Sequence, residues 1–323
     1  MISCVDFIPA YSEFFGYLED RGGYAEVRKL WDFLFVPDGK SIPLINFLNA
    51  EGLRGCWSYW AHSLNEEAAD FTMYLNEKRG FFYNVMHYCP SKGRLLKLQE
   101  EKGYKPYDKY CFHCDYYRKA AEKAGLRYIY NFDGIDRAAC SMLIYDPAVF
   151  DGRVILDDDT LVMDRRASQN EYFHRDFHSG MNNGIQYLGA NYGEDAVRAY
   201  LTRYTNNVLN DTLSDVRERG LDGIADYLRE NYRKEKAADA LTLMREGDTL
   251  TAEIAYCPAV RHLRETGRTV SPWFGMTTTV ICELLAAEAG VRFIEDAYDP
   301  ETGAAKLRFT PRHAPVQPAT RDV

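Results

Sequence analysis

Apolar residues recur at every third or fourth position in several stretches of the chain, which is the spacing expected of helices that bury one face. Four such stretches lie in the first half and four lie in the second half. The predicted helices cover residues 11–18, 24–35, 53–65 and 109–124, and then 184–188, 195–204, 221–234 and 276–289. Gly125 and Gly290 follow the last helix of each half, where a left-handed C-cap is expected.

Shorter stretches rich in β-branched and aromatic residues, bounded by turn residues, predict strands in both halves. The predicted strands cover residues 70–75, 81–88, 127–131 and 141–145, and then 239–244, 250–256, 291–296 and 305–309. In each half, helices come first, two strands follow, and a further helix precedes a closing hairpin. This order predicts an α+β fold in which helices pack on an antiparallel sheet.

The two halves also repeat individual residues at a nearly constant distance. Asp6-Phe7 matches Asp176-Phe177 at an offset of 170 residues, and Cys89-Pro90 matches Cys257-Pro258 at an offset of 168. Such a constant offset over more than 100 residues indicates a tandem duplication. We therefore predict a first copy at 1–147, a linker at 148–169 and a second copy at 170–323. Within the linker, residues 154–156 and 160–163 are expected to form a small hairpin.

The composition excludes several classes of protein. A chain of 323 residues with 46% hydrophobic and 27% charged residues is typical of about two globular domains. Its net charge of −9 argues against a nucleic-acid partner, because such binding relies on Lys and Arg. The sequence contains neither an apolar run of about 20 residues nor a signal-peptide pattern, so we expect no membrane partner and a cytoplasmic location with reduced thiols.

A group of thiols in the first copy is the first candidate site. Cys111 and Cys114 have the C-x-x-C spacing of a metal-binding pair, and thiolates suit zinc or, less well, an iron–sulfur centre. The alternative is a group of buried cysteines that act as small hydrophobic residues. The predicted metal ligands are Cys89, Cys111, Cys114, Cys140 and His113. Three of these cysteines align near Met276, Thr279 and Lys306, so the fold itself does not require them.

A second candidate lies at the predicted start of a helix in the second copy. His174, Asp176 and His178 fall within five residues, and the two histidines share a face if the helix already runs there. Imidazoles can act as acids or bases near neutral pH, so these three residues are candidate catalytic groups. The alternative is a capped helix entry with hydrogen-bonded histidines.

A third candidate centres on Cys257, the cysteine that both copies place identically. A thiol near an imidazole such as His262 could support covalent catalysis, whereas a structural Cys-Pro corner is the alternative. Aromatic residues suit half-wet pockets. We therefore expect Tyr172, Trp273 and Cys282 to contact a substrate.

The residues around Cys257-Pro258, the helix that ends at Gly290 and the final hairpin resemble the L-2-amino-thiazoline-4-carboxylic acid hydrolase family. The first copy resembles it more fully, through Cys89-Pro90, Cys114-Asp115 and Cys140. The outline is also similar to small-molecule-binding domains of the vinyl-reductase type, in which helices pack on an antiparallel sheet.

This resemblance implies a hydrolase that opens a C–N bond of a small cyclic amidine or thiazoline-like substrate, with or without a metal ion. It also leaves open a relative that binds a small molecule or a metal without catalysis, as a sensor or carrier. A bound zinc ion would supply hydroxide near neutral pH. Because a chain with two copies can bury the surface through which single copies would pair, we expect a monomer or a homodimer.

Overall fold

A computed structural model describes residues 1–39 and 42–312 of the chain. In this part of the chain the fold is α+β, with twelve α-helices and two antiparallel sheets, which confirms the predicted class. By its internal contacts the chain divides into two compact units. Unit 1 joins Met1–Phe14 to the residues from Arg175 onward, and unit 2 is Phe15–His174. The division falls inside helix α1 (Phe7–Gly22).

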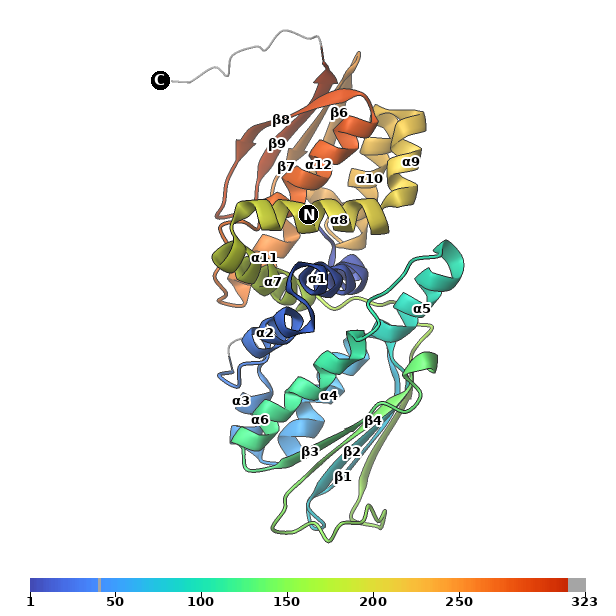
Figure 1. Ribbon diagram of the computed structural model, residues 1–323, viewed down its shortest axis with the longest axis vertical. Helices are drawn as coiled ribbons and strands as arrows, with labels where there is room; N and C mark the ends of the chain where they lie inside the picture. The colour runs from blue at the N-terminus through green and yellow to red at the C-terminus, as the bar shows by residue number, and fades with distance from the viewer. Residues whose placement is uncertain (40–41, 313–323) are drawn as a thin grey trace. The chain divides into compact units, whose positions relative to one another are not determined.

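Unit 2 packs helices against a five-stranded sheet with the order β3-β4-β2-β1-β5 (Figure 1). Its helices are α2 (Tyr24–Leu34), α3 (Leu44–Glu51), α4 (Arg54–Glu66), α5 (Pro90–Lys102) and α6 (Arg118–Lys123), with 3-10 helices η2 (Tyr110–Tyr117) and η3 (Ile135–Arg137). Its strands are β1 (Asp70–Asn76), β2 (Phe81–Tyr88), β3 (Arg127–Asn131), β4 (Cys140–Tyr145) and β5 (Leu161–Arg166).

The core of unit 2 lies between its sheet and the helices α4 and α6. Trp60 of α4 stacks on Phe82 of β2, with ring centroids 5.6 Å apart. Phe71 and Met73 of β1 are completely buried in the same cluster. Aromatic rings bury large apolar areas, so this layer supplies much of the driving force for folding of the unit.

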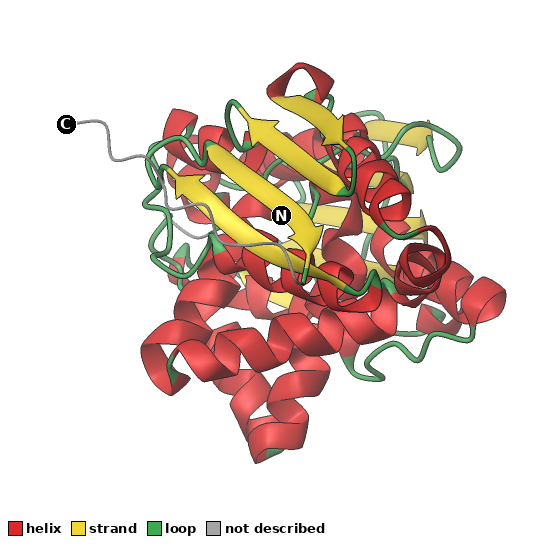
Figure 2. Ribbon diagram, turned by 90° about the horizontal axis from the view of Figure 1, so that it is seen from above, coloured by secondary structure: helices red, strands yellow, loops and turns green. Residues whose placement is uncertain are grey.

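Unit 1 packs helices against a four-stranded sheet with the order β6-β7-β9-β8. Figure 2 shows strands lying side by side with helices gathered against them. The helices are α7 (Phe177–Tyr192), α8 (Glu194–Val208), α9 (Asn210–Arg219), α10 (Leu221–Lys234), α11 (Pro258–Glu265) and α12 (Met276–Glu288), with 3-10 helices η1 (Cys4–Asp6) and η4 (Ala238–Ala240). The strands are β6 (Leu241–Glu246), β7 (Thr249–Ile254), β8 (Val291–Tyr298) and β9 (Ala305–Pro311).

The first residues of the chain complete the core of unit 1. Phe7 stacks on Phe177, with ring centroids 4.5 Å apart, and the hydroxyl of Tyr200 donates a 2.9 Å hydrogen bond to the carbonyl of Ala10. Phe14 meets the ring of Tyr200 edge-on. These contacts explain why residues before Phe15 group with unit 1. The predicted boundaries at 147 and 170 concern the repeats in the sequence and stay a prediction.

The two units follow the same order of elements and of strands. Read from its other edge, the sheet of unit 1 runs β8-β9-β7-β6, which matches β3-β4-β2-β1 of unit 2. Gly23 and Gly193 link the first two helices of each series with φ of 77° and 82°, and Gly52 and Gly220 link the next two with φ of 60° and 61°. Such positive φ angles favour glycine, so the same turn chemistry occurs in both series.

Three local predictions are wrong. Residues 154–156, which the structure describes, form no strand, and β5 pairs with β1 instead of closing a linker hairpin. The predicted helix at 109–124 begins as the 3-10 helix η2 and becomes an α-helix only at Arg118. No helix is predicted directly after Cys89 or Cys257, but the structure has α5 and α11 there, because proline suits the first turn of a helix.

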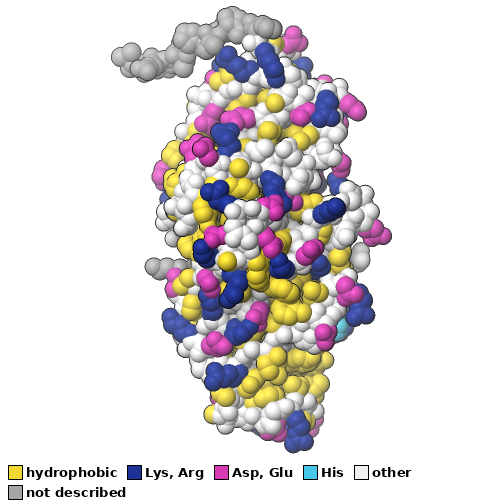
Figure 3. Space-filling model, in the orientation of Figure 1, with side chains coloured by type: hydrophobic (Ala, Val, Ile, Leu, Met, Phe, Trp, Pro, Cys, Tyr) yellow, Lys and Arg dark blue, Asp and Glu magenta, His cyan; other side chains and the backbone are white. Residues whose placement is uncertain are grey.

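Charged side chains of both signs are interspersed over the face seen in Figure 3, so the net charge of −9 is not gathered in one patch on that face. Within residues 1–39 and 42–312, no helix combines the length and the apolar character that crossing a lipid bilayer requires.

Gly55 tests the close packing of α3 and α4. A Cβ atom at Gly55 would overlap the backbone carbonyl group of Phe47, which cannot move without shifting α3. We expect Gly55→Ala to lower the free energy of unfolding by about 1–3 kcal/mol, measured by urea denaturation. His62→Ala on the exposed face of the same helix is the control. Equal stability of Gly55→Ala and the wild type would contradict this packing.

Candidate functional site

The predicted group of His174, Asp176 and His178 is divided between the two units. Helix α7 begins only at Phe177, so His174 precedes it and the condition under which the two histidines would share a helical face is not met. His174 belongs to unit 2, where its Nδ1 lies 2.6 Å from the Glu66 carboxylate. His178 belongs to unit 1 and has a different carboxylate partner.

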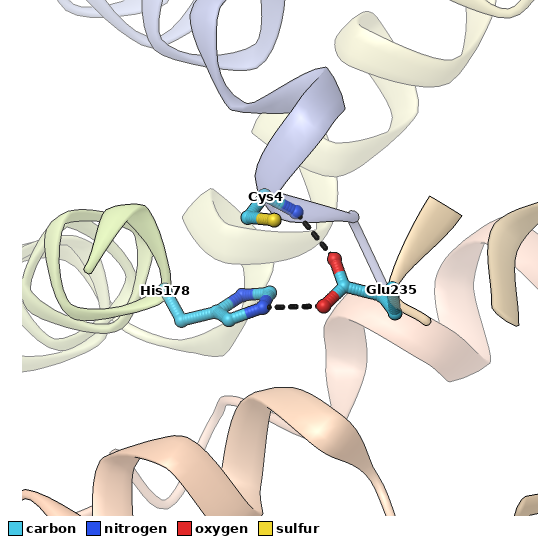
Figure 4. Close-up of side chains that lie close together, drawn as sticks. All are labelled: Cys4, His178 and Glu235. Carbon is cyan, nitrogen blue, oxygen red and sulfur yellow. Dashed lines mark hydrogen bonds and ion pairs between the residues drawn. The ribbon is translucent and has the colours of Figure 1, made fainter. Parts of the chain in front are cut away.

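That partner is Glu235, at the C-terminal cap of α10. Its Oε2 lies 2.9 Å from His178 Nε2, and its Oε1 accepts a 2.6 Å hydrogen bond from the backbone N–H of Cys4 (Figure 4). Cys4 and His178 are each 1% exposed and Glu235 is 5% exposed. Three segments distant in sequence therefore meet in a fully buried cluster of unit 1, which we name the Cys4 cluster: Cys4, His178 and Glu235.

The electrostatics of the Cys4 cluster favour a protonated thiol beside an ionised carboxylate. Burial raises the pKa of Cys4, and the neighbouring Glu235 raises it further. Burial also acts to raise the pKa of Glu235, but hydrogen bonds from His178 and from Cys4 outweigh this effect and lower it. Cys4 is therefore not an activated nucleophile, because catalysis requires the thiolate.

Asp176 takes a different role from the predicted one. It lies 2.9 Å from His262 Nε2, so the imidazole of α11 binds the residue that precedes α7. The rings of His262 and His178 are 6.2 Å apart. Unit 1 thus contains two histidine–carboxylate pairs as neighbours, of which only the Cys4 cluster is fully buried.

Cys257 lies at the N-terminal cap of α11, with its Sγ 3.3 Å from the Sδ of Met1. It lines a small pocket of unit 1, and burial raises the pKa of its thiol. Other lining residues are Tyr232, Thr278, Glu295, Tyr298 and Ala305. The space open to the centre of a water molecule is about 10 Å³, which is room for about one water and not for a heterocycle.

The three predicted substrate-binding residues are divided between the two units. Tyr172 is buried in unit 2, where the Arg94 guanidinium lies 4.2 Å from its ring centre. Trp273 of unit 1 packs against Gly189, where any Cβ atom would overlap its ring. Cys282 is 1% exposed within α12.

The predicted metal ligands of unit 2 approach one another from three places. Cys89 caps α5, Cys111 and Cys114 lie on η2, and Cys140 opens β4. The thiols are near enough to raise one another's pKa. Among the described residues, however, the Cys4 cluster is the one group of three ligand atoms within 4.8 Å of one another. The five predicted ligands therefore do not meet at one metal position.

His113 and Cys114 form a thiol–imidazole pair instead. The Nδ1 atom of His113 hydrogen-bonds to the backbone carbonyl of Tyr110, so Nε2 is left as the acceptor and lies 3.7 Å from Cys114 Sγ. The hydroxyl of Tyr130 donates a 3.0 Å hydrogen bond to Cys140 Sγ beside them. A base held by a third group next to a thiol is the arrangement that nucleophilic catalysis uses.

The surroundings of the four predicted thiol ligands favour the neutral thiol. Burial raises the pKa of Cys89, Cys111 (to about 11), Cys114 and Cys140, and in Cys114 the other three thiols add to the effect. Burial lowers the pKa of His113 to about 4, although its bond to Tyr110 acts in the opposite direction. Cys89, Cys114 and Cys140 are nevertheless only partly buried.

Glu67 and Glu235 were missed in the sequence. Both are the C-terminal caps of equivalent helices, and each is followed by a residue with positive φ: Ala68 at 55° and Lys236 at 54°. Burial raises the pKa of Glu67, while His174 acts to lower it, and Glu67 is near enough to Cys89 to raise the pKa of that thiol. The repeat in the sequence could have revealed this pair, because Glu67 and Glu235 stand 168 residues apart, as do Cys89 and Cys257.

Compared with models of known protein families, with curated proteins and with solved structures, the chain gives no match.

The low pKa of His113 has a consequence for stability. In the unfolded chain the imidazole takes up a proton near its ordinary pKa of 6.5, whereas in the folded protein it does so only near 4. We therefore expect the free energy of unfolding to fall as the pH falls from about 6.5 to 4, by at most about 1.4 kcal/mol per pH unit from this group. Urea denaturation at several pH values would measure this slope.

His113→Gln keeps a hydrogen-bond donor for the Tyr110 carbonyl and removes the titration, so its slope over this range should be shallower than that of the wild type. His62→Gln, at an exposed position of the same unit, is the control variant. Parallel curves for His113→Gln and the wild type would show that the folded state does not disfavour a charged His113.

Proposed function

We propose that the protein is a hydrolase of small cyclic amidine or thiazoline-like compounds. Its proposed site is the cluster of thiols in unit 2 that consists of Cys89, Cys111, Cys114 and Cys140. One observation supports this most directly. Nε2 of His113 lies 3.7 Å from Cys114 Sγ, and the other nitrogen of that ring is held by the backbone carbonyl of Tyr110. In the proposed site Cys114 would be the nucleophile, His113 the base and the Tyr110 carbonyl the orienting group.

The proposed reaction adds water across a C–N bond of the ring. Sγ of Cys114 forms a bond to the amidine carbon while the π electrons of the C=N bond move to the ring nitrogen and the thiol proton passes to Nε2 of His113. The ring nitrogen takes that proton from His113 and a second one from the exocyclic amino group, so the ring C–N bond breaks and a C=N bond to the exocyclic nitrogen forms. Water then adds to the same carbon, one of its protons goes to the exocyclic nitrogen and the other returns to Cys114, and the carbon–sulfur bond breaks to leave a carbonyl group. Each proton given up is taken back, so no oxidant or cofactor is consumed.

Neighbouring groups suit the charges that develop during these steps. Glu67 has a raised pKa because it is buried, so a fraction of it can donate a proton to a leaving nitrogen closer to neutral pH than an ordinary carboxyl. The hydroxyl of Tyr130 already donates to the sulfur of Cys140, and its buried ring forms part of the site wall. Neutral thiols around Cys114 keep the site free of competing negative charge.

We also propose that the two units descend from one duplicated domain of the hydrolase and vinyl-reductase type named above. Their matching strand orders and their paired glutamate caps support this. In unit 1 the pocket at Cys257 takes the place of the thiol site. There, Ala305 pairs with Ile254 as Cys140 pairs with Met86, so alanine rather than the expected Lys306 replaces Cys140. We infer that unit 2 is the catalytic one.

Zinc at the predicted cysteine set is not part of this proposal. The thiols and His113 do not converge within ligand distance of one point, so they do not fit a tetrahedral zinc ion as they stand. No step above depends on a metal.

A non-catalytic binding function is the second candidate. It is favoured by the raised pKa of all four thiols, which makes each a poor nucleophile until a ligand changes its surroundings. In that case the same site would hold a small heterocycle without opening it.

Turnover of L-2-amino-thiazoline-4-carboxylate tests the proposal. We expect the wild type to open the ring, Cys114→Ala to be inactive, and His113→Gln to lose about 10²–10⁴-fold in kcat with an altered pH profile. Product formation is followed by chromatography, and binding by calorimetry.

Cys56→Ala, at a completely buried cysteine of the same unit, is the matched control and should keep its activity. Binding without turnover by the wild type would favour the second candidate. If the folded wild type neither binds nor opens the ring, or if Cys114→Ala stays active, the proposed site is wrong.

A further inference from the structure

We propose that the Cys4 cluster of unit 1 binds a single divalent transition-metal ion, with zinc as the best fit. The ligands would be Cys4 Sγ, His178 Nε2 and one oxygen of Glu235. This site lies in a different unit from the proposed hydrolase site, and it does not depend on that proposal.

The positions of the three ligand atoms are the first support for the proposal. The three ligand atoms already lie within 4.8 Å of one another, and the His178 nitrogen and the Glu235 oxygen are 2.9 Å apart. Zinc bonds of about 2.0–2.3 Å to nitrogen, oxygen and sulfur require ligand atoms at about this separation. Coordination would move the His178 nitrogen and the Glu235 oxygen slightly apart around the ion, with Cys4 supplying the sulfur from the same cluster (Figure 4).

The charge balance of the buried cluster supports it as well. A thiolate, a carboxylate and a neutral imidazole together carry two negative charges, and a divalent ion cancels both. An uncompensated charge would be very costly at a place where all three residues are nine-tenths or more buried. In the structure the Glu235 carboxylate meets the imidazole of His178 and the backbone N–H of Cys4, and the thiol of Cys4 adds just a weak hydrogen bond.

The donor types also point to a particular class of metal. A set of one sulfur, one nitrogen and one oxygen suits zinc, cobalt or ferrous iron better than magnesium or calcium, which prefer oxygen alone. Three protein ligands leave a fourth position for water or another donor.

The cluster is not a requirement of the fold. The equivalent glutamate of unit 2, Glu67, is a helix cap in the same way, yet Glu67 belongs to no such group of ligand atoms among the described residues. The same architecture therefore forms without a cysteine and a histidine around this carboxylate, and their presence in unit 1 calls for a separate explanation. Metal binding supplies one.

The test uses the full-length protein, purified without a polyhistidine tag, incubated with zinc and then dialysed. We expect one tightly bound zinc ion per chain from this site by mass spectrometry under native conditions. Cobalt loaded in its place should give thiolate-to-cobalt charge-transfer absorption. Cys4→Ser keeps the backbone N–H that bonds to Glu235, so it should fold; it should lose the charge-transfer band and bind zinc at least tenfold more weakly.

Cys282→Ala, at another 1%-exposed cysteine of unit 1, is the matched control and should bind like the wild type. His178→Gln and His262→Gln form a second pair, in which only the former should lose the metal. If the thiols of unit 2 also take up metal, the Cys4→Ser difference still isolates this site. The proposal is overturned if the folded wild type retains no metal after dialysis, or if Cys4→Ser and His178→Gln bind as much as their controls.

Discussion

A carboxylate buried at the C-terminal end of a helix is an unfavourable arrangement for two reasons. It leaves water, and it sits beside backbone carbonyls whose dipoles repel negative charge. Glu235 stands at such a place after α10, and it is tolerated because His178 and the backbone of Cys4 surround it with donors. The folding of unit 1 is therefore tied to this carboxylate. Helix α7 must deliver an imidazole to it, and the start of the chain must deliver an N–H group.

In unit 2 the corresponding carboxylate, that of Glu67, has different surroundings from Glu235. Glu67 is only partly buried, and burial raises its pKa. His174 instead contacts the adjacent Glu66. The pKa of Glu67 is thus raised near the thiols, whereas hydrogen bonds from His178 and Cys4 lower the pKa of Glu235. One architecture therefore shifts the pKa of its helix-capping carboxyl group upward in one unit and downward in the other.

Local features of the fold could be read from the sequence. The helix predicted at 221–234 and the strand predicted at 127–131 have the bounds that the structure shows, because apolar spacing and turn residues act over short distances. The helices α5 and α11 were missed, although each begins with a proline, which suits the first turn of a helix. Helix α3 was also missed, since few residues separate it from α4.

The site could be predicted only in part, for a related reason. Which residues might do chemistry is visible in composition and spacing, and His178 and Cys257 were both singled out. Their partners are not visible, because Cys4 and Glu235 are 231 residues apart and nothing local marks them as a pair. His174 and His178 were grouped on the assumption of an earlier helix start. A shift of a few residues at that helix boundary was enough to place the two histidines in different units.

The position of the unit boundary inside α1 also bears on how the protein is made. The ribosome produces residues 1–14 well before their partners in unit 1, which begin only at Arg175. Unit 2 is meanwhile complete in sequence and can fold as it emerges. During that interval Phe7 and Phe14 lack their partners Phe177 and Tyr200. The nascent chain therefore carries an exposed apolar segment until the second half is synthesised.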